Sequence, residues 1–203
     1  MEREMIYDNL PPVIDTTPWM LTDGGALDVD ICPDCWERRA HIERYVFACR
    51  VCTGMRVLDF GCGVGYGSEM LWHVRNDVTG VDSSAQALKL SRSRERHLHP
   101  RALEFAESVP DGAQYDACVA LEVLEHMPEP EQFLATVPAR HLIVSVPVRS
   151  TVGENPHHLH DFTLDGFRQM LERQRWEIRS HWVQVEPFHA APSVGIWHAE
   201  RMA

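Results

Sequence analysis

A short apolar segment that runs into alternating glycines constrains the fold of this chain more than any other feature. Residues 56–60 predict a buried strand, glycine then occupies every second position of 61–67, and 69–73 predict the start of a helix. Glycine can adopt positive φ and lets the backbone come close to a ligand, and a helix N-terminus presents free N–H groups. The sequence therefore predicts a nucleotide-type pocket between a strand and a helix.

The acidic residues beside the glycines narrow the class of ligand. A second predicted strand, residues 77–82, ends in Asp82, from which a carboxylate can accept hydrogen bonds from ribose hydroxyls. The dinucleotide fingerprint G-x-G-x-x-G does not fit, because its third glycine falls on Tyr66 or Ser68 in the two registers. Asp59, just before the glycines, would repel a pyrophosphate but suits a ligand that bears an ammonium and a sulfonium. A nicotinamide dehydrogenase is therefore disfavoured, and S-adenosylmethionine (SAM) fits better.

The stretch V-L-D-F-G-C-G-V-G-Y-G-S (57–68), followed by G-V-D-S-S (80–84), resembles motifs I and II of class I SAM-dependent methyltransferases. The resemblance extends over about residues 41–200. It implies an α/β fold with a Rossmann-like, seven-stranded, mostly parallel sheet, helices on both faces and an antiparallel C-terminal hairpin. A glycine-rich turn that binds no ligand is the alternative interpretation.

The resemblance also implies which residues hold the cofactor. A polar side chain of the helix before motif I would hold the cofactor's carboxylate, while Glu107 would contact the adenine and Leu121 the adenosine. The implied cofactor-binding residues are Arg44, Asp59, Gly61, Gly63, Gly65, Asp82, Ser83, Glu107 and Leu121.

The stretch L-E-V-L-E-H (121–126) is the second informative motif. It resembles the segment after the fourth strand of ubiquinone-biosynthesis O-methyltransferases, and its E-x-x-E-H pattern is similar to the metal site of small-RNA 2′-O-methyltransferases. Glu122, Glu125 and His126 stand at i, i+3 and i+4, which places them on one face of a helical turn. A histidine-rich loop follows the predicted strand 141–147, and His158 in it is the candidate fourth ligand of Mg²⁺ or Mn²⁺.

In the alternative interpretation of this motif no metal binds. Glu125 and His126 then hydrogen-bond the loop, and His158 acts alone as a base. With or without a metal, the candidate catalytic residues are Glu122, His126 and His158.

Two C-x-x-C pairs, Cys32/Cys35 and Cys49/Cys52, form a candidate tetrahedral zinc site. The alternative is that Cys49 and Cys52 are small core residues of the helix predicted before motif I, since free cysteine packs as a buried hydrophobe. Cys62 and Cys118 are expected to serve packing alone. We expect an irregular N-terminal arm or lid over residues 1–35, linked to the domain by zinc if the site forms, and the methyltransferase domain over 36–203.

The amino-acid composition limits which kinds of partner this protein is expected to bind. The 203 residues carry a net charge of −11, which disfavours nucleic acid, and they contain neither a signal-peptide pattern nor an apolar run long enough for a bilayer. We therefore expect a cytoplasmic enzyme that methylates the hydroxyl of a small polar acceptor such as a sugar, a phenol or a natural product. The alternatives are an RNA 2′-O-methyltransferase and a non-catalytic interaction protein that binds SAM or zinc; the sequence leaves the oligomeric state open.

Overall fold

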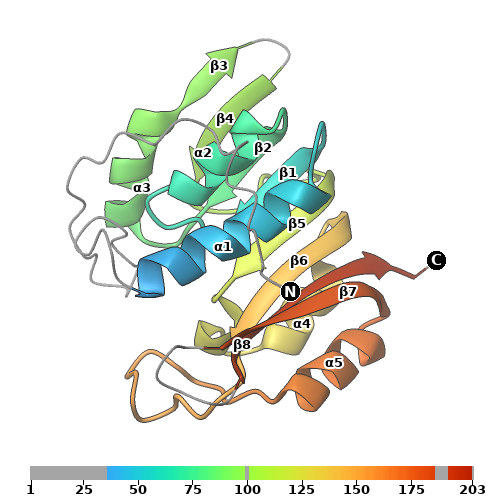
Figure 1. Cartoon of the computed structure of the whole chain (residues 1–203). Coiled ribbons are helices and arrows are strands. Elements are labelled where there is room, and N and C mark those ends of the chain that lie inside the picture. The colour runs from blue at the N-terminus through green and yellow to red at the C-terminus, as the bar shows by residue number, and fades with distance from the viewer. Residues whose placement is uncertain (1–35, 99–100, 186–191, 203) are drawn as a thin grey trace, which may run out of the picture.

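The computed structural model describes residues 36–98, 101–185 and 192–202, and these form one sheet flanked by helices (Figure 1). The expected arm over 1–35, with Cys32 and Cys35, lies outside the described residues. The strands are β1 Arg56–Phe60, β2 Asp77–Val81, β3 Arg96–Leu98, β4 Arg101–Ala106, β5 Tyr115–Leu121, β6 Ala139–Pro147, β7 Trp176–Val185 and β8 Pro192–Arg201. The helices are α1 Trp36–Val51, α2 Tyr66–His73, α3 Ala85–Ser91, α4 Pro130–Thr136 and α5 Leu164–Arg173, with short 3₁₀ turns η1 Arg92–Arg94 and η2 Leu124–His126.

The sheet has the order β3-β4-β2-β1-β5-β6-β8-β7. Five neighbouring strands from β4 to β6 run parallel, whereas β8 pairs antiparallel with β6, and β7 antiparallel with β8. The expected mostly parallel sheet with an antiparallel C-terminal hairpin is therefore confirmed in these seven strands. The short β3, which the sequence did not suggest, adds an eighth strand antiparallel to β4 at the edge.

Apolar side chains on both faces of the central strands explain why helices cover both sides. Val57 of β1 packs in a core cluster with α1, α2 and α3, and the next residue, Leu58, packs in a second cluster with α4 and α5. Successive side chains of a strand point to opposite faces, so a strand that is apolar throughout has to be covered twice. The two clusters are the cores on the two faces of the sheet, beneath the helices that cover it in Figure 1.

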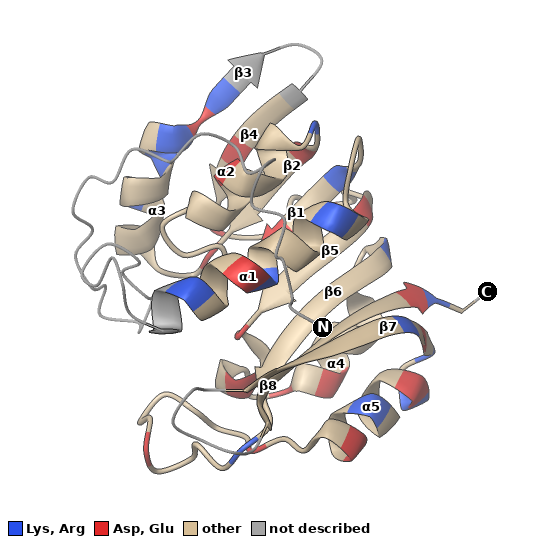
Figure 2. Cartoon of the chain, in the orientation of Figure 1, with Lys and Arg blue, Asp and Glu red and all other residues tan. Residues whose placement is uncertain are grey.

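Helix α5 illustrates how local sequence sets an element. The Thr163 hydroxyl accepts a hydrogen bond from the Gly166 N–H at 3.0 Å and so caps the N-terminus of the helix. Phe167 and Leu171, four residues apart, are completely buried, and acidic and basic residues alternate on the outer side of the helix (Figure 2). This amphipathic helix connects β6 to the hairpin.

The parallel strands end at one edge of the sheet, and this edge gathers the residues singled out in the sequence. The glycine turn follows β1, Asp82 follows β2, Glu122 follows β5, and the histidine-rich loop follows β6. Ligands of open α/β sheets bind outside these carboxyl ends. Within the described ranges, none of the helices has the length and apolar character needed to cross a membrane.

Candidate active site

The glycine turn between β1 and α2 has a conformation that side chains would obstruct. Gly65, the residue before α2, has φ +82°, and a Cβ there would lie 2.7 Å from the ring of Phe105 and 2.9 Å from Cβ of Ser91. Gly67 lies inside α2 with an ordinary φ, but a Cβ there would overlap the ring of Tyr45 at 1.9 Å. The alternating glycines therefore serve two purposes: a left-handed turn, and the close approach of α1 to α2.

Asp82 closes the turn from the end of β2. One carboxylate oxygen accepts a hydrogen bond from the Gly63 N–H and the other from the Ser84 N–H, both at 2.8 Å. Asp82 remains half-buried, so lone pairs of the carboxylate are left for ribose hydroxyls. Ser84 provides the side-chain cap of α3, and its neighbour Ser83 is exposed on the same turn.

Asp59 lies beneath the turn and is completely buried. Its carboxylate accepts hydrogen bonds from the hydroxyls of Ser68 at 2.5 Å and Tyr45 at 3.2 Å. Burial raises the pKa of Asp59 to about 7, and the two hydroxyl donors act in the opposite direction. In the described structure this carboxylate organises the turn from the inside rather than facing the open edge.

The raised pKa of Asp59 predicts a pH-dependent cost in stability. The folded state holds this proton more tightly than the unfolded state, so the contribution of Asp59 is fully present below about pH 4 and is lost as the pH rises to about 7. We expect the free energy of unfolding of the wild type, minus that of Asp59→Asn, to fall by up to about 4 kcal/mol from pH 4 to pH 8. Urea unfolding at several pH values measures this difference; a difference independent of pH would contradict the assignment.

The turn after β5 holds Glu122 in an unusual conformation. Glu122 has φ +57°, which costs a residue with a side chain about 1–2 kcal/mol. Its N–H points at the carbonyl and hydroxyl oxygens of Ser145 in β6, at 3.1 and 3.0 Å, and the Ser145 hydroxyl donates to Glu122 Oε1 at 2.8 Å. Ser145 therefore holds both the backbone and the carboxylate of Glu122 against β6.

The structure gathers Glu125, His126 and His158 but differs from the expectation at Glu122. One ligand atom from each of these three residues lies within 4.8 Å of the others, and Glu122 does not belong to the group. The reason is local: Glu122 precedes the 3₁₀ turn η2 in a left-handed conformation, so it does not share a face with Glu125 and His126. Three of the four predicted divalent ligands are thus together.

The imidazoles of His126 and His158 are each oriented by a hydrogen-bond partner that does not belong to the cluster. Nδ1 of His126 donates to the carbonyl oxygen of His157 at 2.9 Å, which leaves Nε2 of the neutral ring as an acceptor. Nδ1 of His158 lies 2.7 Å from the Thr151 hydroxyl, and the two rings meet edge to face with centroids 4.7 Å apart. Metal-binding histidines are oriented in this way by a partner on the second nitrogen.

The electrostatics of the cluster suit a cation. Glu125 is 1% exposed and its Oε2 has no hydrogen-bond partner. Burial, and then the charge of Glu122, raise the pKa of Glu125 to about 9, while burial and then His126 lower the pKa of His158. Without a cation, Glu125 is therefore protonated at neutral pH and His158 is neutral. The orphaned buried carboxyl oxygen and two available imidazole nitrogens match the donors that divalent transition metals prefer.

The predicted carboxylate-binding residue, Arg44, lies in α1 and is 3% exposed. It donates through NH1 to Oε1 of Gln184 at 2.7 Å. Its charge acts on the surroundings of the site: burial and then Arg44 lower the pKa of His41, and Arg44 also opposes the raised pKa of Glu125. Leu121, the last residue of β5, is buried, whereas Glu107 is exposed just after β4.

Cys49 and Cys52 pack in the hydrophobic core, as expected if they are small core residues and not zinc ligands. Cys52 is completely buried and the half-buried Cys49 packs against the same core cluster. Burial is the main cause that raises the pKa of each thiol to about 12. Because Cys32 and Cys35 lie outside the described residues, the zinc site stays a prediction.

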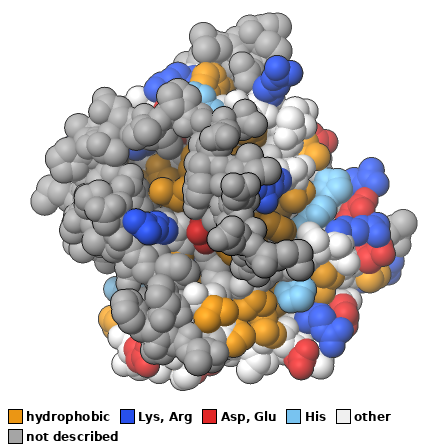
Figure 3. All heavy atoms as spheres, viewed as in Figure 1, with side chains coloured by type: hydrophobic (Ala, Val, Ile, Leu, Met, Phe, Trp, Pro, Cys, Tyr) orange, Lys and Arg blue, Asp and Glu red, His pale blue; other side chains and the backbone are white. Residues whose placement is uncertain are grey.

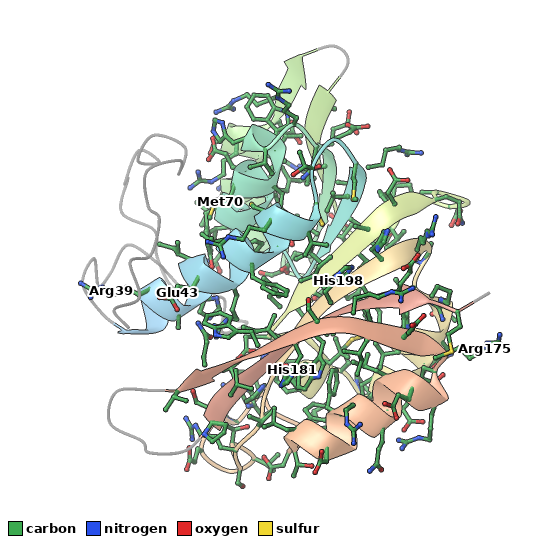
Figure 4. The ribbon with its side chains drawn as sticks, turned by 45° about the vertical axis from the view of Figure 1, so that its right-hand side comes forward. Arg39, Glu43, Met70, Arg175, His181 and His198 are labelled. Atoms are coloured by element: carbon green, nitrogen blue, oxygen red, sulfur yellow. The ribbon has the colours of Figure 1, made fainter. Side chains whose placement is uncertain are left out.

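A second pair of histidines lies away from the carboxyl edge. His141 Nδ1 and His198 Nε2 are 3.2 Å apart across β6 and β8, near the amino end of β6. Histidine side chains lie beside charged residues on the face shown in Figure 3, and His198 is labelled on β8 in Figure 4. Glu200 in this region pairs with Arg140 and Arg179. This group is at the opposite end of the strands from the candidate site.

The sequence did not point to three residues that shape the site: Ser145, Thr151 and Gln184. Ser145 carried a signal in retrospect, because it is the one polar residue inside the apolar run 142–147. A buried hydroxyl at the end of a parallel strand needs a partner. Thr151 and Gln184 are common residues of a loop and a strand, and their partners depend on the fold.

Comparison with known proteins agrees with this architecture. Residues 58–142 match the family model described as "Methyltransferase domain". A "Probable S-adenosylmethionine-dependent methyltransferase" of Mycobacterium tuberculosis is 30% identical over 178 residues, 81% of this chain and 64% of the relative. A ubiquinone biosynthesis O-methyltransferase of Bordetella avium is 39% identical over 82 residues, 38% of this chain and 34% of the relative.

Among solved structures, magnesium protoporphyrin IX methyltransferase from Synechocystis PCC 6803 with bound SAM superposes with a TM-score of 0.66 at 21% identity, covering 82% of each chain. This likeness concerns the fold. The chain spans less than two thirds of the length of the mycobacterial relatives that it matches. Residues 58–142 are therefore similar to a methyltransferase domain, and the chain has the same fold as the magnesium protoporphyrin IX methyltransferase.

Proposed function

We propose that this chain transfers the methyl group of SAM to a hydroxyl of a small polar acceptor. The observation that carries the proposal is the position of the Glu125, His126 and His158 cluster at the same sheet edge as the glycine turn and Asp82. Methyl transfer to oxygen requires a donor site and, close to it, either an imidazole that accepts the hydroxyl proton or a group of ligands for a cation.

The cofactor roles follow from the side chains at the edge. The Asp82 carboxylate accepts hydrogen bonds from the ribose hydroxyls. It does so with the lone pairs that are not used by the N–H groups of Gly63 and Ser84. Arg44 binds the cofactor's carboxylate, and Leu121, Glu107 and Ser83 line the adenosine. Asp59 acts through the turn, since its carboxylate is already bonded to Tyr45 and Ser68.

The reaction is an in-line displacement. The acceptor oxygen forms a bond with the methyl carbon, the carbon–sulfur bond breaks, and its electron pair returns to sulfur to give S-adenosylhomocysteine (SAH). Where no metal is bound, the hydroxyl proton passes to Nε2 of His158, which is neutral because its pKa is lowered. Positioning of the two reactants supplies much of the acceleration, and a general base contributes about 10²–10⁴-fold.

Glu125, His126 and His158 are also the residues that would hold a divalent cation, and the orphaned Glu125 oxygen supports that fit. A bound Mg²⁺ or Mn²⁺ lowers the pKa of a hydroxyl that it contacts. Glu122 is held by Ser145 and does not take part in this set. Its proposed role is to face the acceptor from the end of β5.

The O-methyltransferase relative supports an oxygen acceptor, and the net charge of −11 favours a small molecule over RNA. Incubation with SAM and pools of phenols, sugars and short RNAs, followed by mass spectrometry, tests the proposal. We expect a gain of one methyl on a small hydroxyl compound. Methylated RNA alone would establish the alternative substrate, and a chain that binds SAH but methylates nothing would support the non-catalytic alternative.

Chelation separates the two ways of activating the hydroxyl. We expect EDTA to lower the rate of methyl transfer at least about tenfold and Mn²⁺ or Mg²⁺ to restore it. An unchanged rate in EDTA would mean that His158 acts as the base without a metal. His181→Ala, on the exposed surface of β7, is the control that leaves the rate unchanged.

A further inference from the structure

Arg44 is a buried cation with an incomplete set of partners. It is 3% exposed, its Nε has no hydrogen-bond partner, and no carboxylate of the described residues lies within ion-pair distance of it. Burial of an unpaired guanidinium is costly, so such a group is retained where an anionic ligand completes it. The charge of Arg44 lowers the pKa of His41 and opposes the raised pKa of Glu125.

The residue that orients Arg44 comes from the far end of the chain. Gln184, near the end of β7, is 2% exposed and accepts from NH1 of Arg44 at 2.7 Å. Its amide nitrogen donates to the carbonyl oxygen of Ala40 at 2.9 Å and to Oε2 of Glu43 at 3.2 Å. Figure 4 labels Glu43 on α1, the helix that carries all three partners.

These contacts fix the direction of the Gln184 amide. A flipped amide would turn its oxygen toward the Ala40 carbonyl and the Glu43 carboxylate, neither of which can donate. The oxygen therefore has to face Arg44. The Ser193 hydroxyl further holds the backbone of Gln184 by donating to its carbonyl oxygen at 3.1 Å. The hairpin thus presents one rigid acceptor to the guanidinium.

The neutral amide oxygen of Gln184 and a carboxylate would affect the positive charge of Arg44 differently. An amide oxygen orients the guanidinium but leaves its positive charge available, whereas a carboxylate in the same place would pair with it. We infer that Gln184 is a positioning residue for Arg44, through which the C-terminal hairpin controls recognition of the cofactor's carboxylate. This inference rests on the proposed function, because it takes SAM as the anionic ligand.

The test compares two ligands that differ only at the amino-acid end. SAH carries the carboxylate, and 5′-methylthioadenosine shares the adenosine and thioether but lacks it. We expect Gln184→Glu to weaken SAH at least about tenfold in calorimetric titrations, and to leave 5′-methylthioadenosine unchanged, because the new carboxylate competes for Arg44. We expect the thermal midpoint of Gln184→Glu to fall below that of the wild type, because one of its carboxylate oxygens faces the Ala40 carbonyl and the Glu43 carboxylate; unchanged binding of 5′-methylthioadenosine shows that the site is still folded.

Two further variants keep the test decisive. Gln132→Glu, on the exposed surface of α4, adds the same charge away from Arg44 and should bind both ligands like the wild type. Gln184→Met removes the hydrogen bonds without adding charge, so we expect a smaller loss of SAH affinity together with a lower thermal midpoint. Equal losses for both ligands in Gln184→Glu, or no loss for either, would overturn the inference. A wild type that binds 5′-methylthioadenosine but not SAH would overturn it too, whereas binding of neither ligand would defeat the proposed function itself.

Discussion

Gly65→Ala is expected to weaken SAH binding by at least about 100-fold. The left-handed φ of +82° costs a residue with a Cβ about 1–2 kcal/mol. The added methyl group would also lie 2.7 Å from the Phe105 ring and 2.9 Å from Ser91, both of which are buried and cannot retreat. The turn has to move instead, and the N-terminus of α2 moves with it. Calorimetric titration with SAH measures the loss.

Gly54→Ala is the matched control for this substitution. Gly54 also has positive φ, +71°, but no heavy atom lies within 4 Å of its missing Cβ. The variant therefore carries the backbone strain without the overlap, and we expect a stability loss of about 1 kcal/mol with unchanged SAH affinity. Normal SAH binding by Gly65→Ala, or an equal loss in Gly54→Ala, would contradict the assigned role of the turn.

Removal of His158 is expected to abolish binding of a divalent cation at the cluster. Its Nε2 is directed by the Thr151 contact at Nδ1, and it completes a set with Glu125 and His126. We expect His158→Ala and Glu125→Gln each to weaken Mn²⁺ binding at least about 100-fold in titrations followed by electron paramagnetic resonance, since loss of an outer partner alone costs 10–100-fold. SAH affinity should stay within about twofold.

His181→Ala serves again as the control, because it removes an imidazole from the exposed surface of the hairpin (Figure 4). It should bind Mn²⁺ like the wild type. Retention of Mn²⁺ by His158→Ala and Glu125→Gln would place the cation elsewhere. A wild type that binds no Mn²⁺ at millimolar concentration would leave His158 as a base without a metal.

Local patterns predicted the frame of the site well. The left-handed turn of the glycines and the contact of Asp82 with the Ser84 N–H depend on residues a few positions apart, and their geometry follows from backbone sterics and side-chain capping. The mostly parallel order of the central strands follows from apolar runs that have to be covered on both faces. These elements were predictable because the conformation of each depends mainly on residues close to it in the sequence.

Tertiary contacts decided what the sequence could not show. The spacing of Glu122 predicts a face shared with Glu125, but its backbone is left-handed because Ser145, 23 residues away, holds it. The Arg44–Gln184 contact joins residues 140 positions apart. Neither partner carries a local signal for the other, since hydroxyls and amides bond wherever the fold brings them.

Isothermal titration calorimetry of the whole chain with SAH tests cofactor binding most directly. We expect one SAH per chain with a Kd of about 1–100 µM, and no heat with NAD⁺ or a flavin at the same concentrations. A chain that gave no heat with SAH or SAM and bound NAD⁺ or a flavin tightly would contradict the assignment of the glycine turn, and with it the proposed methyl transfer.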